Sequence, residues 1–407
     1  MKATTDWPSL PLTQAFWFQE GPGVRNWQFT TSGIKLLNVA NIEKGGTLNL
    51  EKTDRHLDET EVAKKYSHFL VDAGDLVIAS SGISFDDDGL LRTRGAFVRA
   101  EQLPLCLNTS TIRFKAIDGV SDLRFLRLWL NGREFRSQIT KLVTGTAQQN
   151  FGPSHLKATK ITLPPLAEQR RIAEVLDRAE ALRVKRRAAL AQIDSLTQSL
   201  FLDLFGDPVS NPKKWLNPTL GGLLAFQQYG PRFYNESYSA DGIRIVRITD
   251  LSEEGVLDFS SMPRLVVSDE DREKYALRPG DLIFARTGAT VGKVALIQPN
   301  DPPCIAGAYF ITMRFKDSVV PIYARAVLTA PSVRAIVAKR SRQAAQQNFS
   351  GPGLRELPMP IPPIELQRDF ARRVGAVEKL KTAQRASLAE MDALFASLQH
   401  RAFRGKL

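Results

Sequence analysis

The 407-residue chain has few of the side chains on which most active sites are built. It holds two cysteines, Cys106 and Cys304, and four histidines. The histidines, at positions 56, 68, 155 and 400, lack ligand or triad spacing, so neither a metal centre nor a histidine-based triad is expected. The cysteines lie 304 − 106 = 198 residues apart, at what we take to be equivalent sites of two domains. They are expected to be buried, reduced thiols.

Long hydrophobic runs are also absent. No stretch approaches the ~18 apolar residues of a membrane span. The segment Met1–Trp7 has no apolar signal region. The sequence therefore predicts a soluble, cytoplasmic protein. Hydrophobic residues make up 43% and charged residues 24%, which is typical of a globular protein, and the length suits two to three domains.

Three patterns that resemble catalytic motifs are incomplete. Asp301–Cys304 resembles the Asp-Pro-Pro-aromatic motif of amino-methyltransferases, but cysteine replaces the aromatic residue that must stack on the base. Gly288–Lys293 is one residue short of a phosphate-binding loop, and Val294 stands where Ser or Thr would bind magnesium. Asp86–Asp88 could bind a metal, but a solvated acidic loop explains it as well. We therefore expect no active site in this chain.

Positive charge is abundant. Lys and Arg number 55 against 43 acidic residues, which gives a net charge of +12 and a sequence pI near 9.7. A balance of this kind is typical of nucleic-acid-binding proteins when the charges cluster.

The second prominent feature is a long internal repeat. Gln148–Phe151 returns as Gln346–Phe349, at an offset of 346 − 148 = 198 residues. Gly33–Asn41 returns as Gly242–Asp250 at an offset of 209, and Gly74–Ala79 as Gly280–Ala285 at an offset of 206. The chain is therefore two copies of one domain-plus-helix unit, and the changing offset shows that the copies differ by small insertions between shared elements. A protein built twice is expected to bind something with two halves.

Each copy begins with an α+β globule of roughly 160 residues. Ile243–Ile248 and Leu282–Ala285 are rich in β-branched and aromatic residues, and they read as strands. Phe125–Leu130 and Tyr323–Leu328 read as short helices. The predicted domains are 1–163 and 207–361, each followed by a helical region, 164–206 and 362–407.

The two helical regions carry a sustained apolar stripe. Pro164-Pro165 and Pro362-Pro363 mark their starts, and the first is predicted to run from Leu166 to about Phe205, roughly 60 Å. We expect the two helices to pair as an antiparallel coiled coil about a pseudo-two-fold axis. The alternative is that each helix folds on its own globule. The residues expected to pair are Ile172, Ala179, Leu182, Ile193, Leu196, Leu200, Phe370, Val377, Leu380, Met391, Leu394 and Leu398.

Basic residues precede the repeated Gln-Gln-Asn in both copies. Lys and Arg neutralise phosphates, and Gln or Asn can pair with an adenine edge. A loop that is identical in both copies is a poor reader of two different sequences, so it is expected to clamp the DNA backbone or to form a hinge between each globule and its helix. Specificity is expected in the loops that differ. The candidate DNA-binding residues are Arg25, Gln28, Arg92, Arg94, Lys141, Gln148, Gln149, Asn150, Arg232, Arg286, Thr287, Lys293, Arg340, Arg342, Gln346, Gln347 and Asn348.

The order of these motifs, present twice, resembles the specificity subunit of type I restriction-modification enzymes. In that family two target-recognition domains alternate with two long helices that follow a Pro-Leu-x-Glu-Gln-Arg-like segment. Here the segment is Pro165–Arg170, with Pro363–Arg368 in the second copy. The Gly-Asp-Leu strands and Phe205–Pro208 are also similar.

The resemblance implies that each globule reads half of a bipartite, asymmetric DNA target, with the helices setting the spacing. Two methyltransferase subunits and the motor-nuclease subunits would bind alongside. The chain itself would carry no cofactor, while S-adenosylmethionine, Mg²⁺ and ATP would belong to the partners. Remaining alternatives are a specificity protein of another restriction class, a self-contained DNA methyltransferase or nuclease, and a coiled-coil scaffold without a DNA role.

Overall fold

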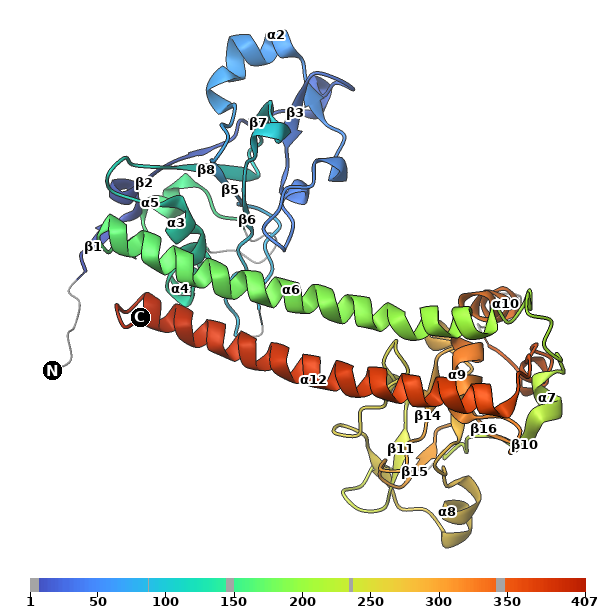
Figure 1. Ribbon diagram of the computed structural model, residues 1–407. Helices are drawn as coiled ribbons and strands as arrows, with labels where there is room; N and C mark the ends of the chain where they lie inside the picture. Colours follow the sequence, from blue (N-terminus) through green and yellow to red (C-terminus); the bar gives the residue numbers. More distant parts are fainter. Residues whose placement is uncertain (1–6, 87, 144–149, 234–236, 342–347) are drawn as a thin grey trace. The chain divides into compact units, whose positions relative to one another are not determined.

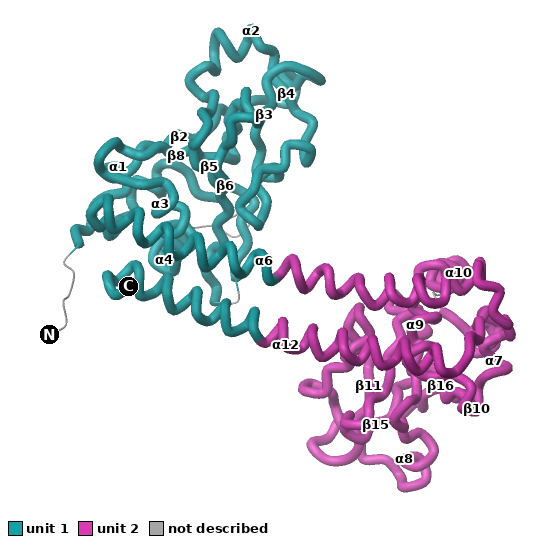
Figure 2. The backbone as a smooth tube through the Cα atoms, viewed as in Figure 1, with its two compact units in different colours: residues 1–186, 387–407 teal, residues 187–386 magenta. Residues whose placement is uncertain are grey.

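The structure is a computed structural model that describes residues 7–86, 88–143, 150–233, 237–341 and 348–407 (Figure 1). The chain forms two compact units, which are coloured separately in Figure 2. Unit 1 comprises residues 1–186 and 387–407, and unit 2 comprises residues 187–386. Each unit therefore contains one sheet region together with a segment of each long helix.

Unit 1 is built on two small sheets. The first has the strand order β2-β8-β5-β6 and is antiparallel, and the second has the order β4-β3-β7 with β3 and β7 parallel. A further pair joins β1 to β9. The strands are β1 (Ser9–Pro11), β2 (Phe16–Glu20), β3 (Ile34–Leu37), β4 (His56–Leu57), β5 (Leu76–Ala79), β6 (Gly95–Phe97), β7 (Leu105–Leu107), β8 (Thr111–Ala116) and β9 (Lys160–Thr162). The helices of this region are α1 (Leu12–Ala15), α2 (Glu59–Glu61), α3 (Leu123–Leu130), α4 (Arg133–Leu142) and α5 (Pro153–Lys157).

Unit 2 repeats this topology. Its sheets have the orders β10-β16-β13-β14 and β12-β11-β15, again with one parallel pair, β11 with β15. The strands are β10 (Leu224–Tyr229), β11 (Ile243–Val246), β12 (Arg264–Leu265), β13 (Leu282–Ala285), β14 (Val294–Leu296), β15 (Cys304–Ala306) and β16 (Phe310–Phe315). The helices are α7 (Leu220–Leu223), α8 (Asp269–Tyr275), α9 (Pro321–Thr329), α10 (Pro331–Ser341) and α11 (Gly351–Arg355). The predicted α+β repeat is confirmed.

The repeated Gly-Asp pair explains why the central strands start where they do. Gly74 and Gly280 have φ values of 90° and 91°, a left-handed conformation that glycine adopts without strain. The next residue, Asp281, is fully buried, and its two carboxylate oxygens accept 2.7 Å hydrogen bonds from Arg314 on the neighbouring strand. The motif thus turns the chain and fixes β13 against β16.

The long helices α6 (Leu166–Phe205) and α12 (Ile364–Ala402) run antiparallel in each unit (Figure 1). In unit 1, Arg183 donates to Asp392 at 2.7 Å, and its guanidinium lies 4.4 Å from the Phe395 ring centroid. In unit 2, Lys381 forms a 2.8 Å ion pair with Asp194. The predicted pairing is confirmed, and within the described chain no helix is long and apolar enough to span a bilayer.

The predicted leucine seam is wrong at four positions. Leu182, Leu196, Leu380 and Leu394 are 54%, 45%, 45% and 59% exposed. The long side chains of Arg183 and Lys381 lie at the helix contact instead, and they are only 16% and 10% exposed.

The other predicted seam residues divide into two groups. Ile172 and Phe370 are fully buried in the cores of their own units, and Leu200 and Leu398 pack at the edges of those cores. The remaining four are partly buried, and they are Ala179, Ile193, Val377 and Met391.

The two cysteines are free and buried, as expected, but they do not occupy equivalent sites. Lys35 pairs with Leu105, and Arg244, its counterpart at an offset of 209, pairs with Cys304. Cys304 therefore matches Leu105, and Cys106 lies one residue out of step. Successive strand residues point to opposite faces of a sheet. Cys304 therefore packs on the face that Leu105 occupies in unit 1, and Cys106 packs on the opposite face. Burial raises the pKa of each thiol to about 12.

A buried glutamine joins each globule to its long helix. Gln169 accepts the backbone N–H of Asp122 at 2.9 Å and donates to the carbonyls of Val120 and Pro164 at 2.9 and 2.8 Å. Gln367 makes the same three contacts, with Val320, Ser318 and Pro362 at 2.9, 3.2 and 2.9 Å. Both side chains are fully buried. The amide thereby bonds to backbone groups of two segments, of which the Pro164 and Pro362 carbonyls form the buried contacts.

We predict that Gln169→Ala and Gln367→Ala each lower the free energy of unfolding by about 2 kcal/mol, because each removes the partner of one buried and two partly buried backbone groups. Urea unfolding of the purified chain measures the change. Gln192→Ala is the matched control, since Gln192 is exposed on α6. Equal effects for all three variants would contradict the proposed junction.

We predict that Leu196→Arg and Leu394→Arg change the free energy of unfolding by no more than about 0.5 kcal/mol, because both side chains are already exposed. Phe201→Ala should cost about 3–5 kcal/mol, since this ring is buried against Phe205, Tyr323 and Phe370. Urea unfolding again measures both. A large loss in either leucine variant would restore the seam as first predicted.

Candidate nucleic-acid interface

The repeated Gln-Gln-Asn-Phe segment ends in a buried aromatic anchor in both units. Phe151 and Phe349 are each 2% exposed. The backbone N–H of Phe151 donates to the carbonyl of Ser80 at 3.0 Å, and that of Phe349 donates to the carbonyl of Arg286 at 2.8 Å. Ser80 and Arg286 are the first residues after β5 and β13, where the divergent loops begin. Each phenylalanine therefore holds the root of a loop, and its ring lies in the core cluster that also contains residues of the long helices, such as Ile172 in unit 1 and Phe370 in unit 2.

The backbone hydrogen bonds at the root of the loop are the same in both units, and we call this set of bonds the frame. The side chains that it carries differ between the units. The N–H of Ser80 donates to the Ser110 carbonyl at 3.0 Å, and the N–H of Arg286 donates to the Tyr309 carbonyl at 2.9 Å. Two serines in unit 1 are thus matched by an arginine and a tyrosine in unit 2. The frame supports a different surface in each unit.

In unit 2 this frame opens onto a cleft of about 1070 Å³. Arg286, Thr287 and Asn348 lie on its wall, together with Tyr238 and Tyr309, which are 62% and 55% exposed. These three wall residues, with Arg232, were predicted from sequence, and the structure brings all four together. The cleft combines cationic, amide and aromatic groups, as nucleic-acid-binding surfaces do.

Two polar atoms of the cleft have no hydrogen-bond partner in the described part of the chain. They are the Nε of Arg286 and the Oδ1 of Asn348, and both are buried. The Arg286 guanidinium stacks over the Tyr229 ring, and its central carbon, Cζ, lies 4.7 Å from the ring centroid. Stacking fixes the direction of the arginine, while the unsatisfied donor and acceptor favour a polar ligand at this position.

In unit 1 the divergent loop 80–94 borders a smaller recess of about 430 Å³, lined by Lys44, Arg92, Arg94 and Arg136. Arg136 pins this loop, because it donates to the Leu91 carbonyl at 2.7 Å and forms an ion pair with Asp86. The paired Arg136 holds the pKa of Asp86 below its ordinary value. The recess presents several cations on one fixed loop.

The acidic triplet at 86–88 is therefore partly structural. Asp86 also accepts the backbone N–H groups of Asp88 and Leu90 at 3.1 and 2.8 Å. No cluster of three His, Cys, Asp or Glu side chains suited to a metal occurs among the residues that the structure describes.

Comparisons with known proteins agree with the sequence motifs. Residues 34–192 match the family model described as a type I restriction modification DNA specificity domain. The chain is 24% identical to the type I restriction enzyme EcoBI specificity subunit of Escherichia coli, over 75% of this chain and 70% of that protein. It is 25% identical to the EcoKI specificity subunit of E. coli strain K12, over 67% of this chain and 63% of that protein. The chain belongs to the family of type I restriction-modification specificity subunits.

Solved structures support the same fold. One chain, from a study of complex assembly and conformational transition of the type I R-M system, matches with a TM-score of 0.62 at 18% identity, over 100% of both chains. The S subunit of the type I restriction-modification system from M. genitalium matches with a TM-score of 0.55 at 16% identity, over 99% of this chain and 98% of that one. At these identities the likeness concerns the fold. A specificity subunit is the non-catalytic member of its enzyme.

Some predicted DNA-contacting residues have partners inside the specificity subunit instead. Lys293 forms a 2.6 Å ion pair with Glu253, and only 11% of its side chain is exposed. The turn before it, Gly288–Thr290, leads into β14 rather than into a helix, so the segment is no phosphate-binding loop. The amide of Gln28 donates to Glu61 and Tyr66 at 2.9 and 3.0 Å.

Other predicted residues lie at the surface away from the unit 2 cleft. Arg25, Arg92, Lys141 and Asn150 are exposed, and Arg94 is partly buried and donates to the Gly82 carbonyl at 3.4 Å. Arg340 is paired with Glu356 at 3.3 Å. The remaining candidates, Gln148, Gln149, Arg342, Gln346 and Gln347, lie outside the described residues.

The sequence does not draw attention to two residues that line the unit 2 cleft, Tyr309 and Arg247. Matching Ile311–Phe315 to Ser110–Phe114 by sequence gives an offset of 311 − 110 = 201. The strand pairings match Thr111 with Phe310, an offset of 310 − 111 = 199, so Tyr309 was overlooked. A strand-by-strand alignment would have shown tyrosine in place of Ser110. Arg247, on the wall of the unit 2 cleft, is the counterpart of Asn38, and its guanidinium is paired with Asp250 at 2.7 Å.

We predict that Arg136→Ala raises the pKa of Asp86 toward its ordinary value and loosens the 80–94 loop. The native carboxylate has a depressed pKa, so its contacts should hold above the unfolded pKa and be lost only as pH falls through the folded one. Carboxyl NMR titration of Asp86 and hydrogen exchange at the Leu90 amide measure both effects. Arg133→Ala, an exposed change on the same helix, is the control. An unchanged pKa of Asp86 in Arg136→Ala would contradict the role of Arg136 in holding the loop.

Proposed function

We propose that the two units read the two halves of a bipartite, asymmetric DNA target, with α6 and α12 setting the spacing between them. The observation that supports this most directly is the matched backbone frame with unmatched side chains: Ser80 and Ser110 in unit 1, Arg286 and Tyr309 in unit 2. One fold with two different reading surfaces suits a target whose halves differ in sequence.

The chemistry of each surface suits DNA. In unit 2, Arg286 and Asn348 carry the donors and acceptors that recognise guanine and adenine edges in the major groove. Tyr238 and Tyr309 present aromatic faces beside them. In unit 1, Arg92 and Arg94 supply cations on the divergent loop, and such groups contribute affinity through phosphates or specificity through bases. Lys141, Arg25, Arg232 and Arg340 are proposed to add backbone contacts, with positive charge favouring association.

The exposed leucines of the long helices are proposed to face partner subunits. Leu182, Leu196, Leu380 and Leu394 are large apolar side chains left outside the helix contact, and exposed apolar side chains that group together mark protein interfaces. The partners of this family are methyltransferase subunits, for which we propose two copies, and motor-nuclease subunits. S-adenosylmethionine, Mg²⁺ and ATP would be held by those subunits, acting on DNA in the cytoplasm.

We predict that Arg286→Ala relaxes recognition at one half of the target only, costing about 1–3 kcal/mol of discrimination at one or two base pairs. Selection of bound sequences from a random DNA library by the assembled complex measures the change. Arg272→Ala, an exposed arginine on α8 outside the cleft, is the matched control. Altered preference in both halves, or a uniform loss across all sequences, would contradict the assignment of one half to this cleft.

A further inference from the structure

In unit 1 one carboxylate ties the globule to the long helix. Asp177 of α6 accepts from two arginines of α3, with Arg124 Nε at 2.8 Å from Oδ2 and Arg127 Nη2 at 2.8 Å from Oδ1. Arg127 also lies over the Phe97 ring, 5.5 Å from its centroid. The Arg127 guanidinium is thus paired with an anion and packed on an aromatic face.

Unit 2 keeps only the arginine of this arrangement. The identical contacts of Gln169 and Gln367 set the offset between α6 and α12 at 367 − 169 = 198 residues. At that offset Arg127 becomes Arg325, Arg124 becomes Ile322 and Asp177 becomes Gly375.

The aromatic partner is also absent from unit 2. Phe97 pairs with Leu76, and its matched residue Leu296 pairs with Leu282. A leucine therefore replaces the ring that lies under the arginine in unit 1. Arg325 therefore lacks the counterparts of both Asp177 and Phe97.

The Arg325 guanidinium has no hydrogen bond or ion pair within the described residues. Burial lowers the pKa of Arg325, and Glu378 on α12 opposes this electrostatically. Among the other charged residues that line the two recesses, Lys381 pairs with Asp194 at 2.8 Å and with Glu378 at 3.4 Å, and Lys293 pairs with Glu253 at 2.6 Å. An unpaired, partly buried charge is costly, so an anion at this place would be stabilised.

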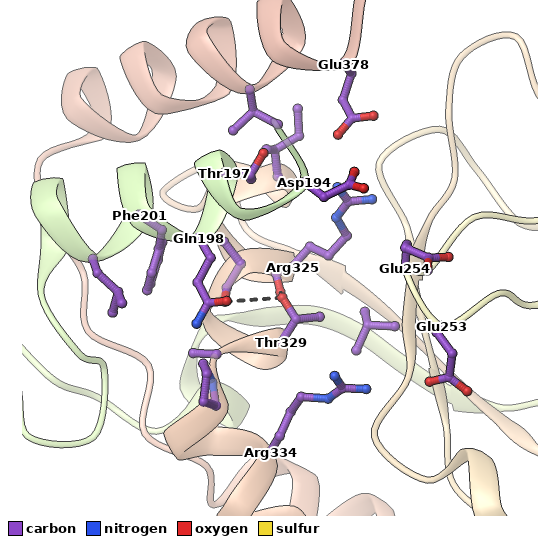
Figure 3. Close-up of a pocket in the computed structure, with 18 of the residues that line it drawn as sticks. Asp194, Thr197, Gln198, Phe201, Glu253, Glu254, Arg325, Thr329, Arg334 and Glu378 are labelled. Carbon is purple, nitrogen blue, oxygen red and sulfur yellow. Dashed lines mark hydrogen bonds between the residues drawn. The ribbon is translucent and has the colours of Figure 1, made fainter. Parts of the chain in front are cut away.

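There is room for such an anion. Arg325 and Gly375 line a recess of about 340 Å³, and Arg325 also borders an adjoining recess of about 260 Å³, where Figure 3 shows its side chain among the labelled charged residues. A Cβ atom placed on Gly375 would meet nothing within 4 Å. The space that the Asp177 side chain occupies in unit 1 is open in unit 2.

We propose that Arg325 binds a carboxylate that the chain itself does not supply, in the place held by Asp177 in unit 1. Guanidinium binds carboxylate through charge-assisted hydrogen bonds, and Arg127 makes one such bond to Asp177 in this molecule. The carboxylate belongs either to a free carboxylic acid or to an Asp or Glu side chain of a docked protein. The two sources share one recognition chemistry and differ in affinity.

The test uses the full chain with ¹⁵N-labelled arginine side chains, and follows the Arg325 Nε–H signal in NMR spectra. Acetate is added up to about 100 mM at constant ionic strength with chloride, and a short peptide with one aspartate between alanines is added separately. We expect a saturable shift in the native chain and in Gly375→Ala, which leaves the recess open. Gly375→Asp supplies its own carboxylate and should abolish the response.

A reciprocal variant gives an independent reading. Asp177→Gly should create the same open site in unit 1, so that Arg127 begins to respond to acetate. Tighter binding of the peptide than of acetate indicates a protein side chain as the source, and equal binding indicates a free carboxylic acid. The proposal is overturned if neither probe shifts Arg325 in the native chain, or if Gly375→Asp responds as strongly as the native chain does. The Gly375 variants decide the matter even if Asp177→Gly does not fold.

Discussion

Two buried glutamine side chains are the constraint on which this molecule depends. Gln169 and Gln367 sit at the first turn of α6 and α12, and each satisfies backbone groups of the globule and of the proline turn before the helix. An amide buried without partners would be strongly destabilising, so these contacts hold in one geometry only. The start of each long helix is thereby fixed to its own sheet region.

Each unit combines this junction with a constant backbone frame and a variable surface. Phe151 and Phe349 close the frame from the opposite end, since each bonds to the root of a divergent loop. The backbone hydrogen bonds are the same in both units, so the side chains at Ser80 and Arg286 can differ without disturbing the strands. Under the proposed function, variation at the loop roots would change the sequence that is read without moving the strands that carry the surface.

Much of the fold could be predicted because the chain is its own comparison. Two copies revealed the α+β units, and the proline turn with the apolar stripe placed the first helix at Leu166–Phe205, as observed. Apolar spacing reports which residues share a stripe but not what covers it, so Leu182 and Leu394 were placed in a seam that Arg183 and Lys381 occupy.

The errors in the site have similar physical causes. A one-residue difference in a strand reverses the face of a side chain, which sequence offsets alone cannot show for Cys106 and Cys304. Pairing within the protein is equally invisible in sequence. Lys293 looks like a free cation until Glu253 is found beside it. The divergent loops around Arg286 were identified correctly as places where the copies differ, because that is a property of the sequence itself.

The most direct measurement is the selection of DNA sequences by the native chain assembled with its methyltransferase partner, starting from a random library. The proposal that each unit reads its own half, with the long helices setting the spacing, predicts two short defined blocks of different sequence, separated by an undefined spacer of constant length. A single uninterrupted block, two blocks with variable spacing, or no sequence preference would contradict the proposal that each unit reads its own half of the target.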